Sequence, residues 1–421
     1  MMSVLYRLAL WLALPWVLAR LWWRGRGEPA YRRHIAERFG WYDFDTAKPV
    51  IWLHAVSVGE TRAAEPLVRA LALRYPDHQI VLTQMTASGR ATAERLFDGT
   101  AHCCYLPYDY PSAVARFLEH FRPRIGVLME TEIWFNLIRA CRQRGVPLLL
   151  ANARLSKKSA RGYARVASLT REALQGLSAV AAQSEEDAAR LTSLGAARVE
   201  VTDNLKFDTT VPDAMRSLGA LLRQRFGADR PVFLAASTRE GEEALLLQAL
   251  AAHPVAGLLT VIVPRHPQRF EEVAALLAAR GHALVMRSEN RDVPPDCAFV
   301  VGDSMGEMAA YFTGCDVAFV GGSLLAYGGQ NFIEACALGV PVLLGPHTYN
   351  FSKASEDALA AGAAVRVADA AKLVECLRGI LADDQMRDAM SQAGLRFCAE
   401  HQGATAKMLA IIERVIKGVI R

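Results

Sequence analysis

The stretch VAFVGGSLLAYGGQNFIEACALGVPVLLGPH, residues 317–347, contains an apolar run, a glycine-rich loop, a helical segment and a second apolar run. Both apolar runs are continuous rather than alternating, which is typical of strands covered on both faces of a parallel sheet. The four glycines of the loop let backbone amides approach an anion, and a helix opening near Asn331 offers free N–H groups to a phosphate. The stretch therefore predicts a strand–loop–helix–strand unit with a ligand loop at the carboxyl edge of its sheet.

The same alternation of apolar runs and helical segments extends over most of the 421 residues. It pauses at residues 209–231, a helical linker with proline and glycine near its ends, and then resumes. The pattern predicts an α/β protein with two doubly wound, Rossmann-like lobes that face a shared cleft. We expect an acceptor-binding lobe over residues 41–210 and a donor-binding lobe, with closing helices, over residues 225–421.

The composition excludes several classes of protein. The net charge of +5 is mild, and no motif that reads DNA or RNA accompanies it, so we expect no nucleic-acid partner. The eight cysteines are scattered and form no C-x-x-C pair or metal-ligand spacing. They indicate buried thiols in a reducing compartment, and we expect neither a bound metal nor a cofactor.

The first 27 residues, MMSVLYRLALWLALPWVLARLWWRGRG, are strongly apolar and rich in tryptophan. Only a dozen apolar residues lie between Arg7 and Arg20, fewer than the ~20 of a comfortable membrane span unless both arginines snorkel. No cleavage site follows, and the arginines after the apolar stretch favour a cytoplasmic location for the rest of the chain. Residues 1–24 therefore predict an uncleaved membrane anchor that spans or lies in the membrane, the alternative being a buried core helix.

The stretch HAVSVGE, residues 54–60, places a carboxylate where an apolar strand ends and a helix begins. A helix N-terminus favours negative charge and should keep Glu60 ionised, which suits a proton acceptor. The alternative is an ordinary glutamate in the first turn of a helix.

Two further stretches of the first lobe carry charged residues. METEIWFN, residues 129–136, places Glu130 and Glu132 on the same side of an extended segment. They could bind a hydroxyl-rich ligand or cap a helix N-terminus, and the sequence alone favours the cap. DNLKFD, residues 203–208, places Lys206 beside the linker, where it could offset charge on a leaving phosphate or lie in solvent.

In the second lobe, three more strand ends carry polar or glycine-containing loops. Arg265 and His266 follow the apolar run VIVP, and they are either phosphate contacts or surface residues. GDSMGEM, residues 302–308, and STREGEE, residues 237–243, repeat the pattern. In the stretch 317–347, Glu334 can accept hydrogen bonds from ribose hydroxyls. Together these strand ends predict one nucleotide site.

These motifs also occur in a specific order along nearly the whole chain. The sequence resembles the two-lobed, GT-B-type 3-deoxy-D-manno-octulosonic acid (Kdo) transferases of Gram-negative bacteria. The resemblance rests on HAVSVGE, METEIWFN, NARLSKKSARGY, DNLKFD, STREGEE, PRHPQRF, GDSMGEM and FVGGSLLAYGGQNFIEACALGVPVLLGPHTYNF. It implies an inverting glycosyltransferase that moves Kdo from CMP-Kdo to a lipid A precursor, lipid IVA, at the cytoplasmic face of the inner membrane.

The resemblance also implies roles for individual residues. Glu60 matches the general base, and Glu130 and Lys206 match residues that stabilise the transition state. The positions that match CMP-binding segments are Arg265, His266, Met305, Gly306, Glu307, Asn331, Phe332, Ile333 and Glu334. The chain departs from the family pattern at Phe135, where proline is usual, and at Arg239 and Gln330, where histidine is usual.

The implied acceptor is a phosphorylated, acylated disaccharide in the membrane. The stretch NARLSKKSARGYAR, residues 152–165, is basic enough to grip its phosphates, or it is a solvated basic helix. Arg265, Lys206 and amide dipoles can replace a metal for a leaving group with one phosphate. Two rival functions are a transferase that uses a UDP-sugar and a membrane-tethered scaffold without activity.

Overall fold

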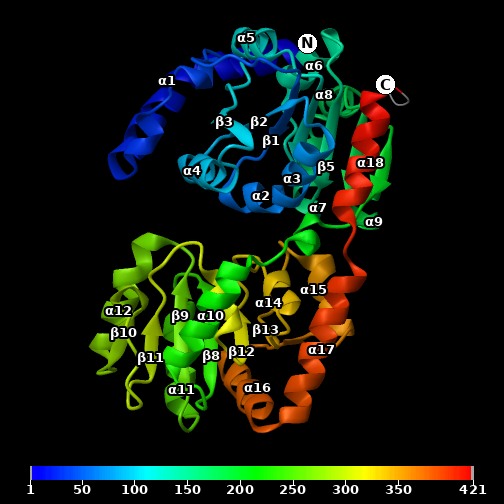
Figure 1. Ribbon diagram of the computed structural model, residues 1–421. Helices are drawn as coiled ribbons and strands as arrows, with labels where there is room; N and C mark the ends of the chain where they lie inside the picture. The colour runs from blue at the N-terminus through cyan, green and yellow to red at the C-terminus, as the bar shows by residue number, and fades with distance from the viewer. Residues whose placement is uncertain (1, 419–421) are drawn as a thin grey trace. The chain divides into compact units, whose positions relative to one another are not determined.

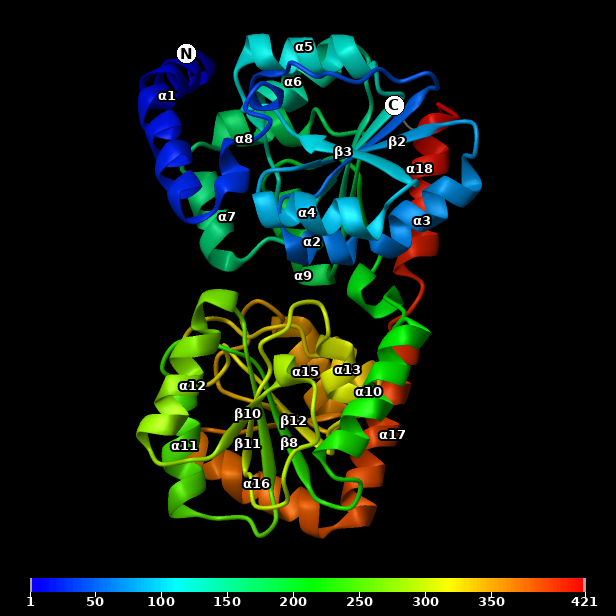
Figure 2. The ribbon, with the colours of Figure 1, turned by 60° about the vertical axis from the view of Figure 1, so that its left-hand side comes forward.

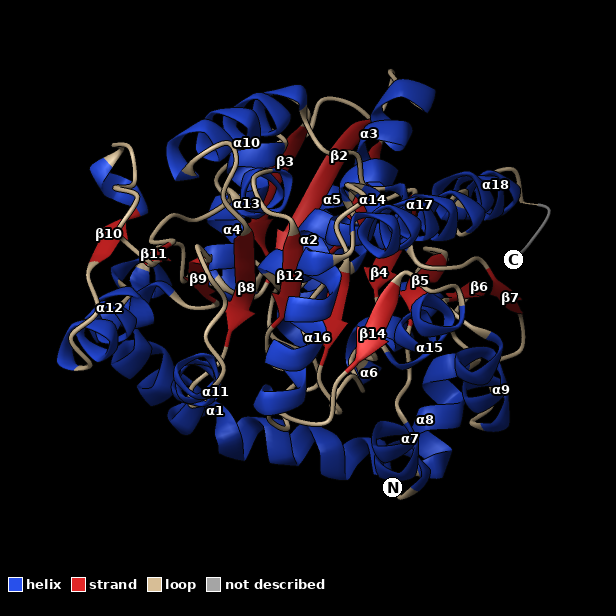
Figure 3. Ribbon diagram, turned by 90° about the horizontal axis from the view of Figure 1, so that it is seen from below, coloured by secondary structure: helices blue, strands red, loops and turns tan. Residues whose placement is uncertain are grey.

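The computed structural model describes residues 2–418, which form two compact units (Figure 1). The first unit contains residues 2–209 and 403–418, and the second contains residues 210–402. Each unit is a parallel sheet with helices on both faces, as the continuous apolar runs predict. The sheets of both units are seen in Figure 3, where strands are red.

The sheet of the first unit has the strand order β3-β2-β1-β4-β5-β6-β7. Its strands are β1 Val50–His54, β2 Gln79–Gln84, β3 Ala101–Tyr105, β4 Ile125–Met129, β5 Leu148–Ala153, β6 Ala179–Ala182 and β7 Val199–Val201. Adjacent residues enter opposite cores: Trp52 packs in one buried cluster and Leu53 in the other. The order places the carboxyl ends of β1, β4 and β5 side by side.

Two layers of helices cover this sheet, and the long helix α1 precedes it. The bounds are α1 Met2–Gly27, α2 Val58–Ala63, α3 Glu65–Arg74, α4 Ala87–Leu96, α5 Pro111–Phe121, α6 Phe135–Gln143, α7 Lys157–Ala164, α8 Ala167–Leu174, α9 Glu185–Ser193 and α18 Ala404–Ile416. Short 3₁₀ helices are η1 Pro29–Arg32, η2 Glu37–Phe39 and η3 Leu205–Asp208. Helices α5, α6, α8 and α9 bury side chains in the Trp52 core, whereas α3, α4 and α18 line the Leu53 core.

Helix α18 corrects the predicted lobe boundary. Its residues Met408 and Ile412 are fully buried in the core of the first unit, although residues up to 421 were assigned to the second lobe. The Asp208 carboxylate fixes the start of the helix by accepting from the backbone N–H groups of Gly403 at 2.7 Å and Thr405 at 2.5 Å. The chain therefore returns to the first unit, where α18 packs beside α3 (Figure 2).

The sheet of the second unit has the order β10-β11-β9-β8-β12-β13-β14. Its strands are β8 Val232–Thr238, β9 Leu259–Pro264, β10 Leu284–Met286, β11 Phe299–Val301, β12 Val317–Val320, β13 Val342–Leu344 and β14 Ala364–Arg366. Its helices are α10 Asp213–Phe226, α11 Glu242–Ala252, α12 Phe270–Ala279, α13 Met308–Thr313, α14 Ile333–Ala337, α15 Ser352–Ala360, α16 Ala370–Ala382 and α17 Asp384–Glu400, with η4 Pro267–Arg269 and η5 Arg287–Glu289. The carboxyl ends of β11, β9, β8 and β12 are neighbours in this order.

The predicted linker is an integral part of the second unit. Helix α10 packs on α13 so closely that a Cβ atom at Gly219 would lie 2.3 Å from Cβ of Thr313. The second unit therefore begins before residue 225, because this glycine contact makes α10 part of its core.

Candidate functional site

Glu60 lies in the first turn of α2, which begins shortly after β1 ends. Its Oε2 accepts from the Val56 N–H at 2.8 Å, and its Oε1 accepts from the Ser57 hydroxyl at 3.1 Å. These bonds fix the carboxyl group at the carboxyl edge of the sheet. They resemble a helix cap, so the capping interpretation describes part of what Glu60 does.

The ionisation of Glu60 differs from the prediction. Burial, the largest cause, and the negative charge of Glu130 together raise the pKa of Glu60 from 4.5 to about 8, against the hydrogen bonds from Val56 and Ser57. Helix α2 has only six residues, so its dipole is small beside the cost of desolvating a carboxylate. The group is therefore tuned close to neutral pH instead of being held fully ionised.

Glu130 follows β4 and is held between two cations. Lys206 Nζ lies 3.5 Å from Glu130 Oε1, and Arg154 Nη2 lies 3.8 Å from Oε2. The backbone of Glu130 has φ 57°, a left-handed conformation that costs a non-glycine residue about 1–3 kcal/mol, and its N–H donates to Ala151 O at 2.9 Å. The structure thus brings together the three candidate catalytic residues of the first lobe, Glu60, Glu130 and Lys206.

The position of Lys206 depends on asparagine side chains. Asn204 Oδ1 accepts from the Lys206 N–H at 3.1 Å, and Asn152 Oδ1 accepts from the Leu205 N–H at 3.1 Å. Leu205 and Phe207 on either side of the lysine are buried. No role is predicted for Asn152 from the sequence, although an asparagine at the end of the apolar run PLLLAN is a signal for one.

The acidic pair of METE does not cap a helix. Asp109 instead accepts from the first amides of α6, Asn136 N at 3.0 Å and Leu137 N at 2.8 Å. Glu132 accepts from the Trp134 indole N–H at 2.6 Å. The capping interpretation, which the sequence alone favoured, is therefore wrong for both glutamates.

The predicted basic cluster is divided by the fold. Arg154 contacts Glu130, as described, while Lys157, Lys158 and Arg161 are exposed on α7. The N-cap Ser156 starts this helix by accepting from the Ser159 N–H at 3.1 Å. The exposed side chains suit either a phosphorylated surface or solvent.

In the second unit, the glycine-rich loop already binds a carboxylate of the chain itself. Glu242 is fully buried, and its oxygens accept from the N–H groups of Gly322 at 2.6 Å, Leu324 at 3.0 Å and Arg239 at 2.8 Å. The prediction that this part of the loop offers its amides to an external anion is therefore wrong. A tightly packed turn contributes to this, because a Cβ at Gly321 would lie 2.5 Å from Ser237 O.

The segment from Asn331 to Glu334 leads into α14, close to the predicted helix start. Asn331 Oδ1 accepts from the Ile333 N–H at 3.3 Å. The side chains of Phe332 and Ile333, both predicted to bind the nucleotide, are buried in the core, so only their backbone can face a ligand. Glu334 is half-buried in the first turn.

Arg265 and His266 follow β9 and lie in a positively charged environment. Arg265 Nε donates to Gln330 Oε1 at 3.1 Å, which joins two of the predicted loops. Burial lowers the pKa of His266, and the charges of Arg239, Arg265 and Arg269 lower it further. Arg269 is paired with Glu243 at 2.7 Å, so Arg239 and Arg265 are the arginines beside His266 that suit an anion.

Met305, Gly306 and Glu307 follow β11, the strand next to β9. Gly306 has φ 89°, Met305 is exposed, and Glu307 pairs with Arg287 at 3.2 Å. Glu307 also accepts from the Ser304 hydroxyl at 2.7 Å. Its carboxylate is therefore engaged within the protein, so the predicted nucleotide contact of this turn depends on its backbone.

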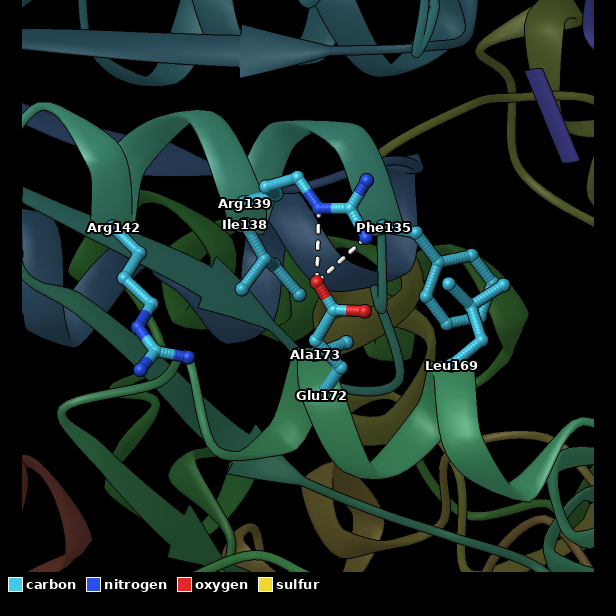
Figure 4. Close-up of a pocket in the computed structure, with 8 residues that line it drawn as sticks. Phe135, Ile138, Arg139, Arg142, Leu169, Glu172 and Ala173 are labelled. Atoms are coloured by element: carbon cyan, nitrogen blue, oxygen red, sulfur yellow. Dashed lines mark hydrogen bonds and ion pairs between the residues drawn. The ribbon is translucent and has the colours of Figure 1, made fainter. Parts of the chain in front are cut away.

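A separate shallow hollow lies between α6 and α8 of the first unit (Figure 4). Arg139 on α6 donates two hydrogen bonds to Glu172 on α8 across it, at 2.9 and 2.6 Å. None of the predicted catalytic residues lines this hollow. Within residues 2–418, no group of three or more His, Cys, Asp or Glu side chains is arranged to hold a metal ion.

Comparison with known proteins gives two family matches and close relatives. The family model described as 3-deoxy-D-manno-octulosonic-acid transferase matches residues 33–209, and the model of glycosyl transferases group 1 matches residues 280–397. A 3-deoxy-D-manno-octulosonic acid transferase of Bordetella pertussis is 45% identical, covering 97% of this chain and 98% of its own. The enzyme of that name from Haemophilus influenzae is 35% identical, covering 91% and 92%.

Among solved structures, Anabaena HepE in complex with UDP has a similar fold. It superposes with a TM-score of 0.61 at 15% identity, covering 87% of this chain and 99% of its own. At this identity the similarity concerns the fold alone, and it agrees with two Rossmann-like lobes of the GT-B type.

Proposed function

Because the chain belongs to the 3-deoxy-D-manno-octulosonic acid transferases, we propose that it moves Kdo from CMP-Kdo to the lipid A precursor lipid IVA. The chain is a glycosyltransferase that transfers Kdo in lipopolysaccharide biosynthesis, and the identity of the acceptor is the proposed part. The observation that carries the mechanism is the carboxyl group of Glu60, tuned near neutral pH beside Glu130.

In this mechanism Glu60 is the general base. The anomeric carbon of Kdo becomes oxocarbenium-like as CMP departs, and a hydroxyl of the acceptor glucosamine attacks from the opposite face, so the configuration inverts. Glu60 takes the hydroxyl proton as the new bond forms. A base with a pKa close to the working pH is efficient at this step, which typically contributes about 10²–10⁴-fold in rate.

Glu130 and Lys206 support that step in different ways. Lys206 supplies positive charge at the site, and its ion pair with Glu130 holds it there. The charge of Glu130 also helps to raise the pKa of Glu60. We infer that Glu130 acts by positioning Lys206 and by setting the protonation of Glu60.

We propose that CMP binds in the second unit at the ends of β9, β11 and β12. Arg239 and Arg265 beside His266 supply positive charge for the departing phosphate, with Arg265 held by Gln330. Asn331 and Glu334 suit polar contacts with the ribose or the sugar, and the backbone of residues 305–307 suits the base. This concentration of positive charge supports catalysis without a divalent metal.

The family and helix α1 fit a membrane-associated protein. In the described part of the chain, α1 is the one helix long and apolar enough to cross a membrane, judged by length and composition. We propose the cytoplasmic side of the inner membrane as the location, because arginines follow the apolar stretch directly. The exposed basic residues of α7 then suit the phosphates of the acceptor.

Incubation of the purified full-length protein with CMP-Kdo and detergent-dispersed lipid A precursor tests this function. Mass spectrometry should show the acceptor gaining Kdo, equally with and without excess chelator. Parallel reactions with UDP-sugars test the rival donor. Transfer from a UDP-sugar alone would overturn the proposed donor, and no transfer from any donor would support the scaffold. Activity that returns only when magnesium or manganese is added would overturn metal independence.

A further inference from the structure

Helix α1 is attached to the first unit by polar side chains near its N-terminus. The Tyr6 hydroxyl donates to Asp109 Oδ2 at 2.8 Å, and Arg7 Nε donates to Asn136 Oδ1 at 3.2 Å. The Tyr6 ring also packs edge-on against Phe135, with centroids 5.1 Å apart. Asp109 and Asn136 belong to the hydrogen-bonded start of α6, so the attachment is made to a well-anchored part of the unit.

Further contacts fix the rest of the helix. The Tyr110 hydroxyl donates to the carbonyl oxygen of Leu10 at 2.8 Å. Near the other end, Leu21 is buried with Tyr31 and Ala87, the first residue of α4. The helix is therefore held along the first unit at two places well separated in its sequence.

The opposite face of α1 has no polar residue between residues 5 and 23. At 100° per residue, one face collects the positions that recur every three or four residues. Those positions are all exposed: Leu5, Leu8, Leu12, Trp16, Ala19 and Trp23. A contiguous exposed apolar stripe of this length is unusual for a surface that meets only water.

Arginines border this stripe towards the C-terminal end of α1. The Arg20 guanidinium lies 5.3 Å from the centroid of Trp16, and Arg26 and Arg32 lie 4.3 and 5.0 Å from that of Trp22. Arginine beside tryptophan is the combination found where acyl chains meet headgroups, since the indole is amphipathic and the guanidinium binds phosphate. The charge fits an anionic lipid surface.

We propose that α1 lies in the plane of the membrane interface, docked on the first unit, with the stripe from Leu5 to Trp23 inserted among the lipids. A spanning orientation would carry Tyr6 and Arg7 across the hydrocarbon and away from Asp109 and Asn136. The in-plane orientation keeps those bonds and still buries the stripe. The inference rests on the proposed membrane association, but its tests do not depend on Kdo transfer.

The first test concerns the stripe itself. Leu12 on α1 is 82% exposed and Leu73 on α3 is 84% exposed, so Leu73→Gln is a matched control for Leu12→Gln. In sedimentation with phosphatidylcholine–phosphatidylglycerol vesicles, Leu12→Gln should lower the partition coefficient about 10-fold or more, the scale of one buried leucine. Leu73→Gln should leave it unchanged. Equal partitioning of the two variants would overturn the insertion of this face, and dimerisation that disappears with Leu12→Gln would point to a second copy of the chain.

The second test distinguishes the two orientations. A variant with Arg7→Cys and Asn136→Cys should form a short thiol cross-link both in detergent and when bound to vesicles, as mapped by peptide mass spectrometry. Each single variant serves as its control, since the eight native cysteines are all buried or half-buried. A cross-link that forms in detergent but disappears in the vesicle-bound fraction would show that the helix undocks to span the membrane, and would overturn the proposal.

Discussion

Replacing Glu130 with glutamine should change the pH at which catalysis begins to rise. Glu60 must be ionised to accept a proton, so kcat/KM of the wild type should rise through a pKa of about 8. The increase from the ordinary 4.5 corresponds to about 5 kcal/mol in favour of the neutral carboxyl, at about 1.36 kcal/mol per pH unit. Burial causes the largest part, and the charge of Glu130 is the next cause.

Removing that charge should therefore move the acidic limb of the pH–rate profile to lower pH, while the pKa of Glu60 stays above its ordinary 4.5. We expect a displacement of about one pH unit, or about 1.4 kcal/mol. At pH 6 the ionised fraction of Glu60 should rise from about 1% to about 10%, so the rate relative to its own plateau should increase about tenfold. The plateau itself should fall, because Lys206 loses its ion pair.

Initial rates with subsaturating acceptor between pH 5.5 and 9.5 measure this displacement. Glu132→Gln is the control, because Glu132 raises the pKa of Glu60 more weakly and should move the limb less, in the same direction. An acidic limb that stays in place in Glu130→Gln, or moves to higher pH, would refute the assignment of Glu60 as a base tuned by Glu130.

Three other variants give independent tests. Glu60→Gln should lower turnover at least ~100-fold while CMP binding persists in calorimetry, and near-normal turnover would remove Glu60 from the mechanism. The same variant should melt at a higher temperature, with a larger gain at pH 8 than at pH 5. A carboxyl whose pKa is raised in the folded state destabilises the fold increasingly as the pH rises from about 4.5 to about 8. An equal gain at both pH values would contradict the raised pKa. Glu334→Ala should weaken CMP binding by about 1–3 kcal/mol in calorimetry, whereas the exposed Glu240→Ala should not, and equal affinities would contradict the placement of the nucleotide. Gln330→Ala should raise KM for the donor more than it lowers kcat, because Arg265 loses the partner that orients it; an unchanged KM would contradict that positioning.

The layered fold could be predicted because strands buried on both faces leave a strong local signal. Trp52 and Leu53 enter different cores, which requires the continuous apolar run that the sequence contains. The partner of a terminal amphipathic helix has no such signal. Met408 and Ile412 of α18 show only that one face needs an apolar neighbour, and either unit could have provided it.

The site was predictable to the extent that parallel strands align their carboxyl ends. Glu60 and Glu130 follow the paired strands β1 and β4, so their approach follows from topology. The state of each carboxyl group was not predictable. Glu60 and Glu242 are both acids in the first turn of a helix after a strand, yet one lies beside a second carboxylate and the other is saturated by the amides of a distant loop.

The two units divide charge in a way that suits the two halves of a transfer reaction. In the first unit, the nearby cations Lys206 and Arg154 pair with Glu130, so burial leaves Glu60 with a high affinity for a proton. In the second unit, Glu242 fills the glycine loop and Glu243 pairs with Arg269, which leaves Arg239 and Arg265 as the cations beside His266. A proton acceptor in one unit and positive charge for a phosphate in the other are what the proposed displacement of CMP without a metal requires. Because Glu242 occupies the loop amides, that positive charge must come chiefly from arginine side chains. The loss of an arginine's partner should therefore raise KM for the donor more than the loss of a loop glycine does.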